Sequence, residues 1–292
     1  MMERIFTLLQ YIVPHHALSR LAGRLAEARW PALKNALIGL FIRVYKVNMS
    51  ESGAPRPHDY TTFNEFFTRP LKAGARPIAP APDVVISPAD GMISQIGTIA
   101  GETLIQAKGR DFSLTDLLGA SSMRAAPFRG GAFATIYLSP RDYHRFHMPL
   151  AGALREMVYV PGRLFSVNDA TARHIPGLFA RNERIVARFD TAAGPMALVF
   201  VGAMIVASIE TVWAGVITPP HGRPAVTLYD PPLTLEKGAE AGRFRLGSTV
   251  IALFGRDAVT WAPERVAHSP VRMGEALGTL QPSRAQTVRG CE

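Results

Sequence analysis

From residue 84 onward, the chain consists of short apolar runs rich in Val and Ile, which Gly and Pro interrupt at close intervals. Helical patterns do not alternate regularly with these runs, which disfavours a parallel strand-helix-strand architecture. Runs of this length and spacing predict a mostly antiparallel β core. The predicted strand segments are residues 84–86, 92–96, 133–138, 158–160, 185–189, 196–209, 212–217 and 248–254.

Residues 5–46 have a different pattern, with apolar side chains at the three-and-four spacing of amphipathic helices. Pro14 and Pro31 divide this stretch into three helical segments. The chain is therefore predicted to be α+β, with an N-terminal amphipathic helical region before the β core. Residues 1–47 carry seven Lys or Arg and two acidic residues. Such basic helices suit an anionic membrane surface, and they suit equally a cap that packs on the rest of the protein.

Residues 50–82 form a Pro-rich connector, in which residues 62–67 are expected to be a short helix capped by Thr61 or Thr62. We predict two domains on this basis. Residues 1–57 would be membrane-associating helices, and residues 58–292 a catalytic, β-rich domain.

The composition narrows the chemistry. A chain of 292 residues with 48% hydrophobic residues can build a large core. Its net charge of +9 favours nucleic acid, an anionic membrane or a phosphorylated ligand as partner. The sequence contains no glycine-rich phosphate loop. The single cysteine, Cys291, excludes an intramolecular disulfide and a cysteine metal cluster.

The N-terminal residues lack the pattern of a secretory signal, so we expect a cytoplasmic protein. The longest apolar stretch, residues 196–209, is shorter than the roughly 20 residues that a membrane-spanning helix requires.

Two polar stretches interrupt the β region. Asp90-Gly91 lies between two predicted strands and has the local pattern of a hairpin turn, which would also expose a carboxylate able to orient an imidazole. His144 and His147 lie three residues apart in a predicted loop bracketed by prolines. A metal site would require a third ligand, whereas acid-base catalysis near neutral pH suits two histidines.

The Gly247-Ser248 pair places a hydroxyl nucleophile in an apolar run. Because Gly has no Cβ, the Gly247 carbonyl is open to attack by Ser248, although such a pair is more commonly a strand with a small-residue kink. Alternatively, Asp90, His147 and Ser248 could form the triad of a serine hydrolase that acts on lipid esters. The Gly-x-Ser-x-Gly nucleophile pattern is absent around Ser248, which disfavours that reading.

Several motifs in order resemble the bacterial phosphatidylserine decarboxylases. They are Pro88-Ala89-Asp90-Gly91, the stretch from Tyr137 to Pro149, the stretch from Phe179 to Arg184, and Leu246-Gly247-Ser248-Thr249. The resemblance extends from the N-terminal helices to residues 273–278. It departs from the family chiefly in residues 221–237 and in the tail after residue 280.

The resemblance implies a proenzyme that cleaves itself between Gly247 and Ser248. Ser248 would attack the Gly247 carbonyl, with His147 as general base and Asp90 as the carboxylate that orients it. β-Elimination would then separate a large chain, residues 1–247, from a small chain, residues 248–292. Ser248 would become a covalent pyruvoyl group, the cofactor of the enzyme, with no metal and no pyridoxal phosphate.

The resemblance also implies the reaction and its setting. Phosphatidylserine would form a Schiff base with the pyruvoyl group, lose carbon dioxide and leave as phosphatidylethanolamine, with His144 as candidate proton donor. The two chains would stay associated, and the family is compatible with a homo-oligomer. We expect a peripheral protein that binds phosphatidylserine and an anionic membrane at the cytoplasmic face of the inner membrane, and that does not bind nucleic acid.

Overall fold

A large antiparallel sheet forms the centre of the protein in this computed structural model, which describes residues 2–107, 109–204, 208–217, 224–245 and 248–281. Its eight strands lie in the order β12-β7-β8-β9-β14-β5-β2-β16, and every neighbouring pair is antiparallel. The strands are β2 (Gly91–Thr98), β5 (Ala132–Leu138), β7 (Gly152–Val160), β8 (Arg184–Thr191), β9 (Gly194–Gly202), β12 (Ala225–Leu235), β14 (Ser248–Phe254) and β16 (Pro270–Val271). This arrangement confirms the predicted antiparallel β core and the α+β class.

Three smaller sheets accompany the central one. A four-stranded sheet has the order β11-β10-β13-β6, a three-stranded sheet has the order β1-β17-β15, and β3 pairs with β4. Their bounds are β1 (Val84–Ile86), β3 (Thr103–Ala107), β4 (Arg110–Ser113), β6 (Arg145–His147), β10 (Ser208–Thr211), β11 (Gly215–Val216), β13 (Glu240–Arg245), β15 (Val259–Trp261) and β17 (Ala276–Leu280).

Around β14, both faces of the central sheet are buried, as the near-continuous apolar sequence of this strand requires. On one face, Val250 and Phe254 pack with side chains of the four-stranded and three-stranded sheets, such as Phe244. On the other face, Ile251 and Leu253 pack with β3, β4 and short helices. The short helices are α5 (Leu114–Leu117), α6 (Ser122–Ala125), η2 (Ala126–Phe128), α7 (Asp169–His174) and α8 (Leu178–Arg181).

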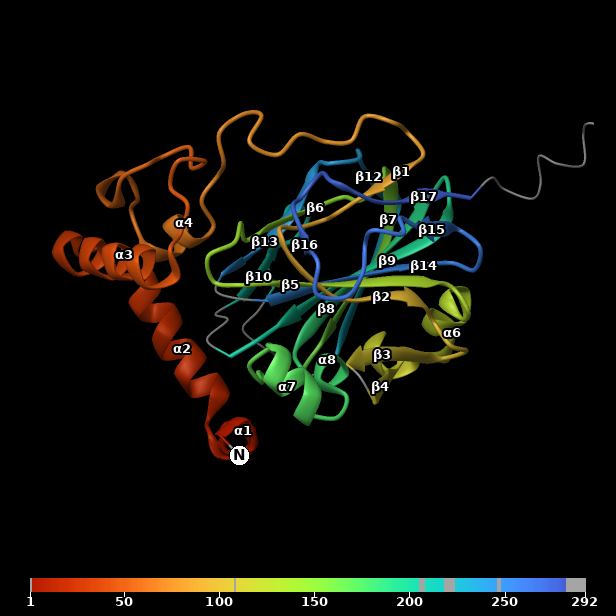
Figure 1. Cartoon of the computed structure of the whole chain (residues 1–292), viewed down its shortest axis with the longest axis horizontal. Coiled ribbons are helices and arrows are strands. Elements are labelled where there is room, and N and C mark those ends of the chain that lie inside the picture. Colours follow the sequence, from red (N-terminus) through yellow and green to blue (C-terminus); the bar gives the residue numbers. More distant parts are fainter. Residues whose placement is uncertain (1, 108, 205–207, 218–223, 246–247, 282–292) are drawn as a thin grey trace, which may run out of the picture.

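The N-terminal helices lie to one side of the strands (Figure 1). We call α1 to α4 the helical region, and residues 68–281, which comprise the connector after α4 and all the sheets, the β region. The helices are α1 (Met2–Ile12), α2 (His15–Ala26), α3 (Pro31–Tyr45), η1 (Pro57–Asp59) and α4 (Phe63–Phe67). Ala26, Ile38 and Phe66 belong to a separate apolar cluster that joins α2, α3 and α4. The predicted helices are confirmed, including the Thr62 cap, whose hydroxyl accepts a hydrogen bond from the Glu65 backbone N–H.

Four local predictions are wrong. Asp90-Gly91 is not a hairpin turn, because β1 pairs with β17 while β2 pairs with β5 and β16, so the segment links two sheets. The apolar run 212–217 is mostly a turn followed by the two-residue β11. The histidine stretch is not wholly a loop, because residues 145–147 form β6 against β13. The run 196–209 contains parts of two strands, β9 and β10, in different sheets. The division into two domains stays a prediction.

Candidate active site

The predicted cleavage pair lies where the chain passes from the four-stranded sheet to the central sheet. β13 ends at Arg245, and β14 begins at Ser248. Gly247, in the connection between them, lies outside the described residues. The Ser248 backbone is in register with Leu138 of β5 on one side and Gly202 of β9 on the other. Ser248 is therefore the first residue of a central strand, and its backbone lies between those of β5 and β9.

Asp90 lies between β1 and β2, and its carboxylate is fully engaged. The Arg76 side chain donates hydrogen bonds from Nε to both carboxylate oxygens, at 2.8 and 3.0 Å, and from Nη2 at 2.5 Å. The Met273 backbone N–H donates a further bond at 2.9 Å. Burial would lower the pKa of Arg76, but its hydrogen bonds and charge interactions with Asp90 and Glu51 raise it. Asp90 and Arg76 thus form a buried ion pair of fixed geometry.

His147 is held by two hydrogen bonds. Nδ1 lies 2.9 Å from the Gly238 carbonyl, which can only accept, so Nδ1 carries the proton. Nε2 therefore accepts from the Tyr143 hydroxyl at 3.2 Å. Burial lowers the pKa of His147, which keeps the imidazole neutral. Among the described contacts Asp90 does not hydrogen-bond to this ring, and the link is through the backbone, where the His147 N–H donates to the Pro88 carbonyl at 2.7 Å.

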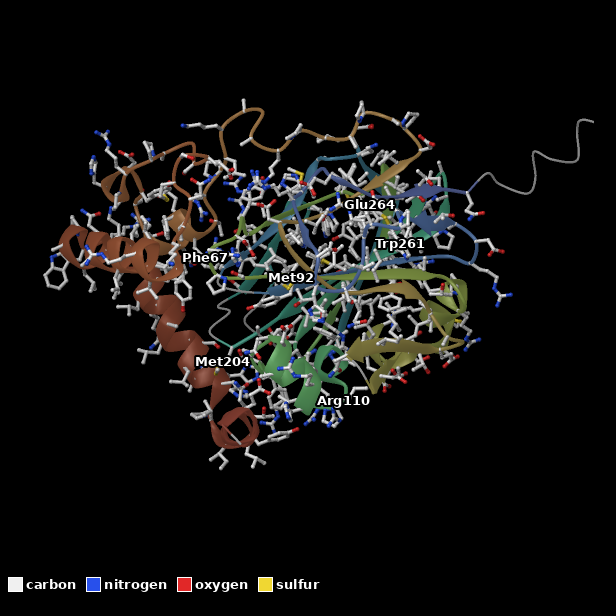
Figure 2. The ribbon with its side chains drawn as sticks, viewed as in Figure 1. Phe67, Met92, Arg110, Met204, Trp261 and Glu264 are labelled. Atoms are coloured by element: carbon white, nitrogen blue, oxygen red, sulfur yellow. The ribbon has the colours of Figure 1, made fainter. Side chains whose placement is uncertain are left out.

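His144 is fully buried and packs against the ring of Phe67, at 4.0 Å between centroids. Figure 2 labels Phe67 where the helical region faces the strands. Nδ1 of His144 donates to the Asp142 carbonyl at 2.9 Å, and Nε2 has no hydrogen-bond partner within the described part of the chain. Burial lowers the pKa of His144 to about 3. The site therefore holds a second neutral imidazole, with one free nitrogen.

The two histidines lie at opposite ends of the β6–β13 pair. The His144 carbonyl accepts from the Phe244 backbone N–H, near the end of β13 that leads to residue 247. His147 is opposite Glu240, at the start of β13. Measured along β13, His144 is thus nearer to the predicted cleavage pair.

Asp90 approaches Ser248 across the central sheet. Gly91, the first residue of β2, lies so close to β5 that a Cβ there would stand 2.2 Å from the Tyr137 carbonyl oxygen. The next residue of β5, Leu138, pairs with Ser248. Since adjacent strands lie about 4.8 Å apart, two strand spacings separate the start of β2 from the start of β14. The structure therefore gathers the Asp90 segment and Ser248 at one end of the sheet.

Comparison with known proteins identifies the family. A family model described as phosphatidylserine decarboxylase matches residues 63–279, and a second, described as PSD, matches residues 5–46. A phosphatidylserine decarboxylase proenzyme from Ectopseudomonas mendocina is 60% identical over 285 residues, covering 96% of this chain and 100% of the relative. The proenzyme from Pseudomonas fluorescens is 60% identical over 282 residues, covering 95% and 98%. That from Bordetella pertussis is 59% identical over 279 residues, covering 94% of each chain. The chain belongs to the phosphatidylserine decarboxylase family.

In this member of the phosphatidylserine decarboxylase family, a pocket of about 920 Å³ opens beside the site. Ser139 and Tyr143 are among its lining residues. Its wall carries charges of both signs, the cationic Lys46, Arg69, Arg76, Arg141, Arg173 and Arg272 and the acidic Glu3, Glu51, Asp90, Asp142, Asp169 and Glu275. Elsewhere, among the described residues, no group of three or more His, Cys, Asp or Glu is arranged to hold a metal ion. The pocket therefore offers cations to an anionic group of a ligand and carboxylates to a cationic one.

Two residues of the candidate site were missed by sequence reasoning. Arg76, which pairs with Asp90, lies in the Pro-rich connector, where an arginine is ordinarily solvated. Tyr143, which hydrogen-bonds to His147, belongs to the same polar motif as the histidines, and that proximity was its only signal. Arg76 gave no comparable signal, because its partner is 14 residues away in another element.

Proposed function

We propose that this chain is a self-cleaving proenzyme that decarboxylates phosphatidylserine to phosphatidylethanolamine. The reaction is supported by family membership, since relatives that match nearly the whole chain are named phosphatidylserine decarboxylase proenzyme. One observation on the structure supports self-cleavage. Ser248 is the first residue of a central strand, and only two residues separate it from the end of β13 in another sheet.

The proposed cleavage uses the chain's own atoms. The Ser248 hydroxyl oxygen bonds to the Gly247 carbonyl carbon as the C–N bond of the peptide breaks, which gives an ester and a free amine. Loss of the Ser248 Cα proton and of the ester C–O bond then releases the Gly247 carboxylate. Water finally replaces the nitrogen of residue 248, which leaves as ammonia. The products are residues 1–247 and residues 248–292 with a pyruvoyl N-terminus.

We assign the general base to His147, because its neutral ring presents Nε2 as an acceptor. The Tyr143 hydroxyl donates a hydrogen bond to Nε2 in this structure. For His147 to act as the base, Tyr143 must give up this hydrogen bond or relay the Ser248 hydroxyl proton to Nε2. We assign the supporting carboxylate to Asp90. Burial lowers the pKa of His147, and the negative charge of Asp90 acts in the opposite direction, so it favours the imidazolium that forms on proton uptake.

The surroundings of residue 248 fit a pyruvoyl group. Both neighbouring strands hold the residue's backbone, and Gly202 opposite it brings no side chain. The pyruvoyl group would supply the electron sink that other decarboxylases obtain from pyridoxal phosphate. His144 keeps the proposed role of proton donor, with Nε2 as the free nitrogen. Because its ring is neutral, Nε2 must take up a proton before it can donate one.

The strand pairing supports lasting association of the two chains after cleavage. β14 lies between β9 and β5 of the large chain, β17 pairs with β1, and β16 pairs with β2. Separation would break the centre of the main sheet and expose its core on both faces. We therefore expect the two fragments to stay together under native conditions.

The helical region supports a peripheral membrane location. Trp30 is 68% exposed and Leu21 is 64% exposed, and other large apolar side chains of α1 to α3 are exposed with them. An exposed apolar face on basic helices is typical of proteins that lie on anionic membranes. None of the helices in the described part of the chain is long and apolar enough to span a bilayer. The cytoplasmic face of the inner membrane stays the predicted location.

The comparisons give no support to the serine hydrolase alternative, since the matched relatives are named decarboxylases.

Intact-mass measurement of the purified full-length protein tests the proposal. We expect two fragments, the smaller beginning at residue 248 with a carbonyl-reactive N-terminus, together with release of carbon dioxide from phosphatidylserine. Ser248→Ala should give one uncleaved, inactive chain. Thr249→Val is the matched control, because the neighbouring hydroxyl is buried without a partner among the described residues. A cleaved, active Ser248→Ala protein would refute the assignment.

A further inference from the structure

Arg69 is a buried cation with most of its donors free. The residue follows α4 and is only 3% exposed. Nη2 donates one long hydrogen bond, 3.3 Å, to the Arg141 carbonyl. Nε and Nη1 are buried and have no hydrogen-bond partner among the described residues. The guanidinium stays charged in proteins, and buried charges are ordinarily paired, so this arrangement is incomplete as it stands.

The neighbouring carboxylates do not complete it. Asp90 is occupied by Arg76 and by the Met273 N–H. Asp142 accepts a hydrogen bond from the Ser139 backbone N–H at 2.7 Å. Burial lowers the pKa of Arg69, and charge interactions with Tyr60, Asp90 and Asp142, in that order, act in the opposite direction without a direct ion pair. The charge of Arg69 is therefore not neutralised by a direct ion pair among the described residues, which leaves it able to attract another anion.

That anion can reach Arg69 through the pocket of about 920 Å³, since Arg69 is one of its lining residues. The pocket extends from Asp90 to Lys46 at the end of α3, and so connects the site with the helical region. Arg69 is also close to the catalytic stretch, because the preceding Thr68 carbonyl accepts a hydrogen bond from the Arg145 side chain. An anion bound by Arg69 would thus lie between the membrane-facing helices and the reacting end of the pocket.

We propose that Arg69 binds the phosphodiester of the lipid headgroup, and so fixes the depth at which the serine moiety enters the pocket. This inference rests on the proposed function. The headgroup carries two anions, and only one is unchanged by the reaction. A fixed cation on the carboxylate would stabilise the charge that decarboxylation must remove, whereas a cation on the phosphodiester binds substrate and transition state alike. Arg69 is accordingly a binding residue, and its loss should raise KM more than it lowers kcat.

Isothermal titration of the uncleaved Ser248→Ala protein tests the inference without any need for cleavage or turnover. The titrants are glycerophosphoserine, glycerophosphoethanolamine, which lacks the carboxylate, and O-methylserine, which lacks the phosphate. We expect Arg69→Met to weaken binding of the first two by about tenfold or more and to leave the third unchanged. Arg272→Gln is the matched control, because it removes the same charge from an exposed position on the same pocket and should change binding by less than about threefold.

Thermal unfolding separates binding from a structural role. Without ligand, Arg69→Met should melt at the same temperature as the parent protein or higher, because it removes an unpaired buried charge. Glycerophosphoserine should stabilise the parent protein and not the variant. Unchanged affinity for both phosphodiesters, or a loss confined to O-methylserine, would overturn the inference. If Arg69→Met fails to fold, Arg69→Lys decides by the same titrations, with an expected loss of about threefold.

Discussion

The β region buries charged side chains, whereas the helical region exposes apolar ones. Asp90, Arg76 and Arg69 are inside the first, and Trp30 and Leu21 project from the second. Both arrangements run against the usual distribution of residues, which puts charge at the surface and large apolar groups inside. In the β region the buried charges surround a pocket, and in the helical region the exposed apolar groups form one side of the amphipathic helices. Each region thus matches one half of a phospholipid, the polar headgroup or the acyl layer.

The buried charges themselves fall into two classes. The ion pair of Asp90 and Arg76 has its hydrogen bonds made, while Arg69 and the Nε2 atom of His144 have theirs open among the described residues. Buried groups whose hydrogen bonds are made keep the geometry of a site, whereas buried groups without hydrogen-bond partners can take up a ligand or a proton. Breaking a satisfied pair should accordingly cost more than altering an open group.

The largest effect is expected for Asp90→Asn. It would remove one of the two carboxylates that pair with the buried Arg76 guanidinium, leaving Glu51, and we expect a loss of about 3 kcal/mol of unfolding free energy and no self-cleavage. Denaturant unfolding and intact mass measure the two effects. The double variant Asp90→Asn with Arg76→Met should recover much of the stability and still not cleave. Recovery of cleavage in the double variant would show that Asp90 acts only by neutralising Arg76.

A smaller effect is expected from the pH dependence that His144 confers. Burial lowers its pKa to about 3 in the folded chain, compared with 6.5 for an unperturbed histidine. Below pH 6.5 the unfolded chain therefore binds a proton that the folded chain does not, so the stability from neutral His144 is lost as pH falls from 6.5 towards 3. The slope from this group is at most about 1.4 kcal/mol per pH unit.

Denaturant unfolding between pH 7 and pH 4 checks this slope. His144→Asn keeps a side-chain N–H for the Asp142 carbonyl and cannot titrate in this range, so its unfolding free energy should fall less steeply than that of the parent. Parallel pH profiles for the two proteins would contradict the prediction. His144→Asn should also cleave at least in part while losing decarboxylation, since we assign His144 to the later reaction.

Sequence patterns predict local structure well and contacts between distant segments poorly. Helices α1 to α3 and strand β14 could be predicted because their apolar periodicity is local. β12 was missed because it contains Pro231 and Pro232 and is largely exposed, so it lacks the apolar run of a central strand. The link at Asp90-Gly91 was misread because the partner of β1 is β17, nearly 200 residues away. Local turn propensity carries no information on such pairing.

The candidate site shows the same division. Asp90, His144, His147 and Ser248 could be named from motifs, since their residue types and order carry the family resemblance. Their hydrogen-bond partners could not be, because those partners are set by tertiary packing. His147 is held by a backbone carbonyl 91 residues away, an interaction that has no residue-type signature. The candidate reactive groups could thus be named from the sequence, and their protonation states could not.

The smallest effect is expected for substitution of an exposed apolar side chain in the helical region. Leu21→Gln removes one exposed apolar side chain from α2, and we expect binding to phosphatidylserine-containing vesicles to weaken by about threefold to tenfold. Thermal stability should not change, because the side chain is not part of the core. Met123→Gln is the matched control, since Met123 is 85% exposed but belongs to α6, which Figure 1 shows on the side of the β region away from the helices. Vesicle sedimentation with both variants measures the difference. Equal weakening by the two substitutions would mean that exposed apolar area anywhere on the protein binds the membrane, whereas an effect confined to Leu21→Gln assigns that contact to the helical region.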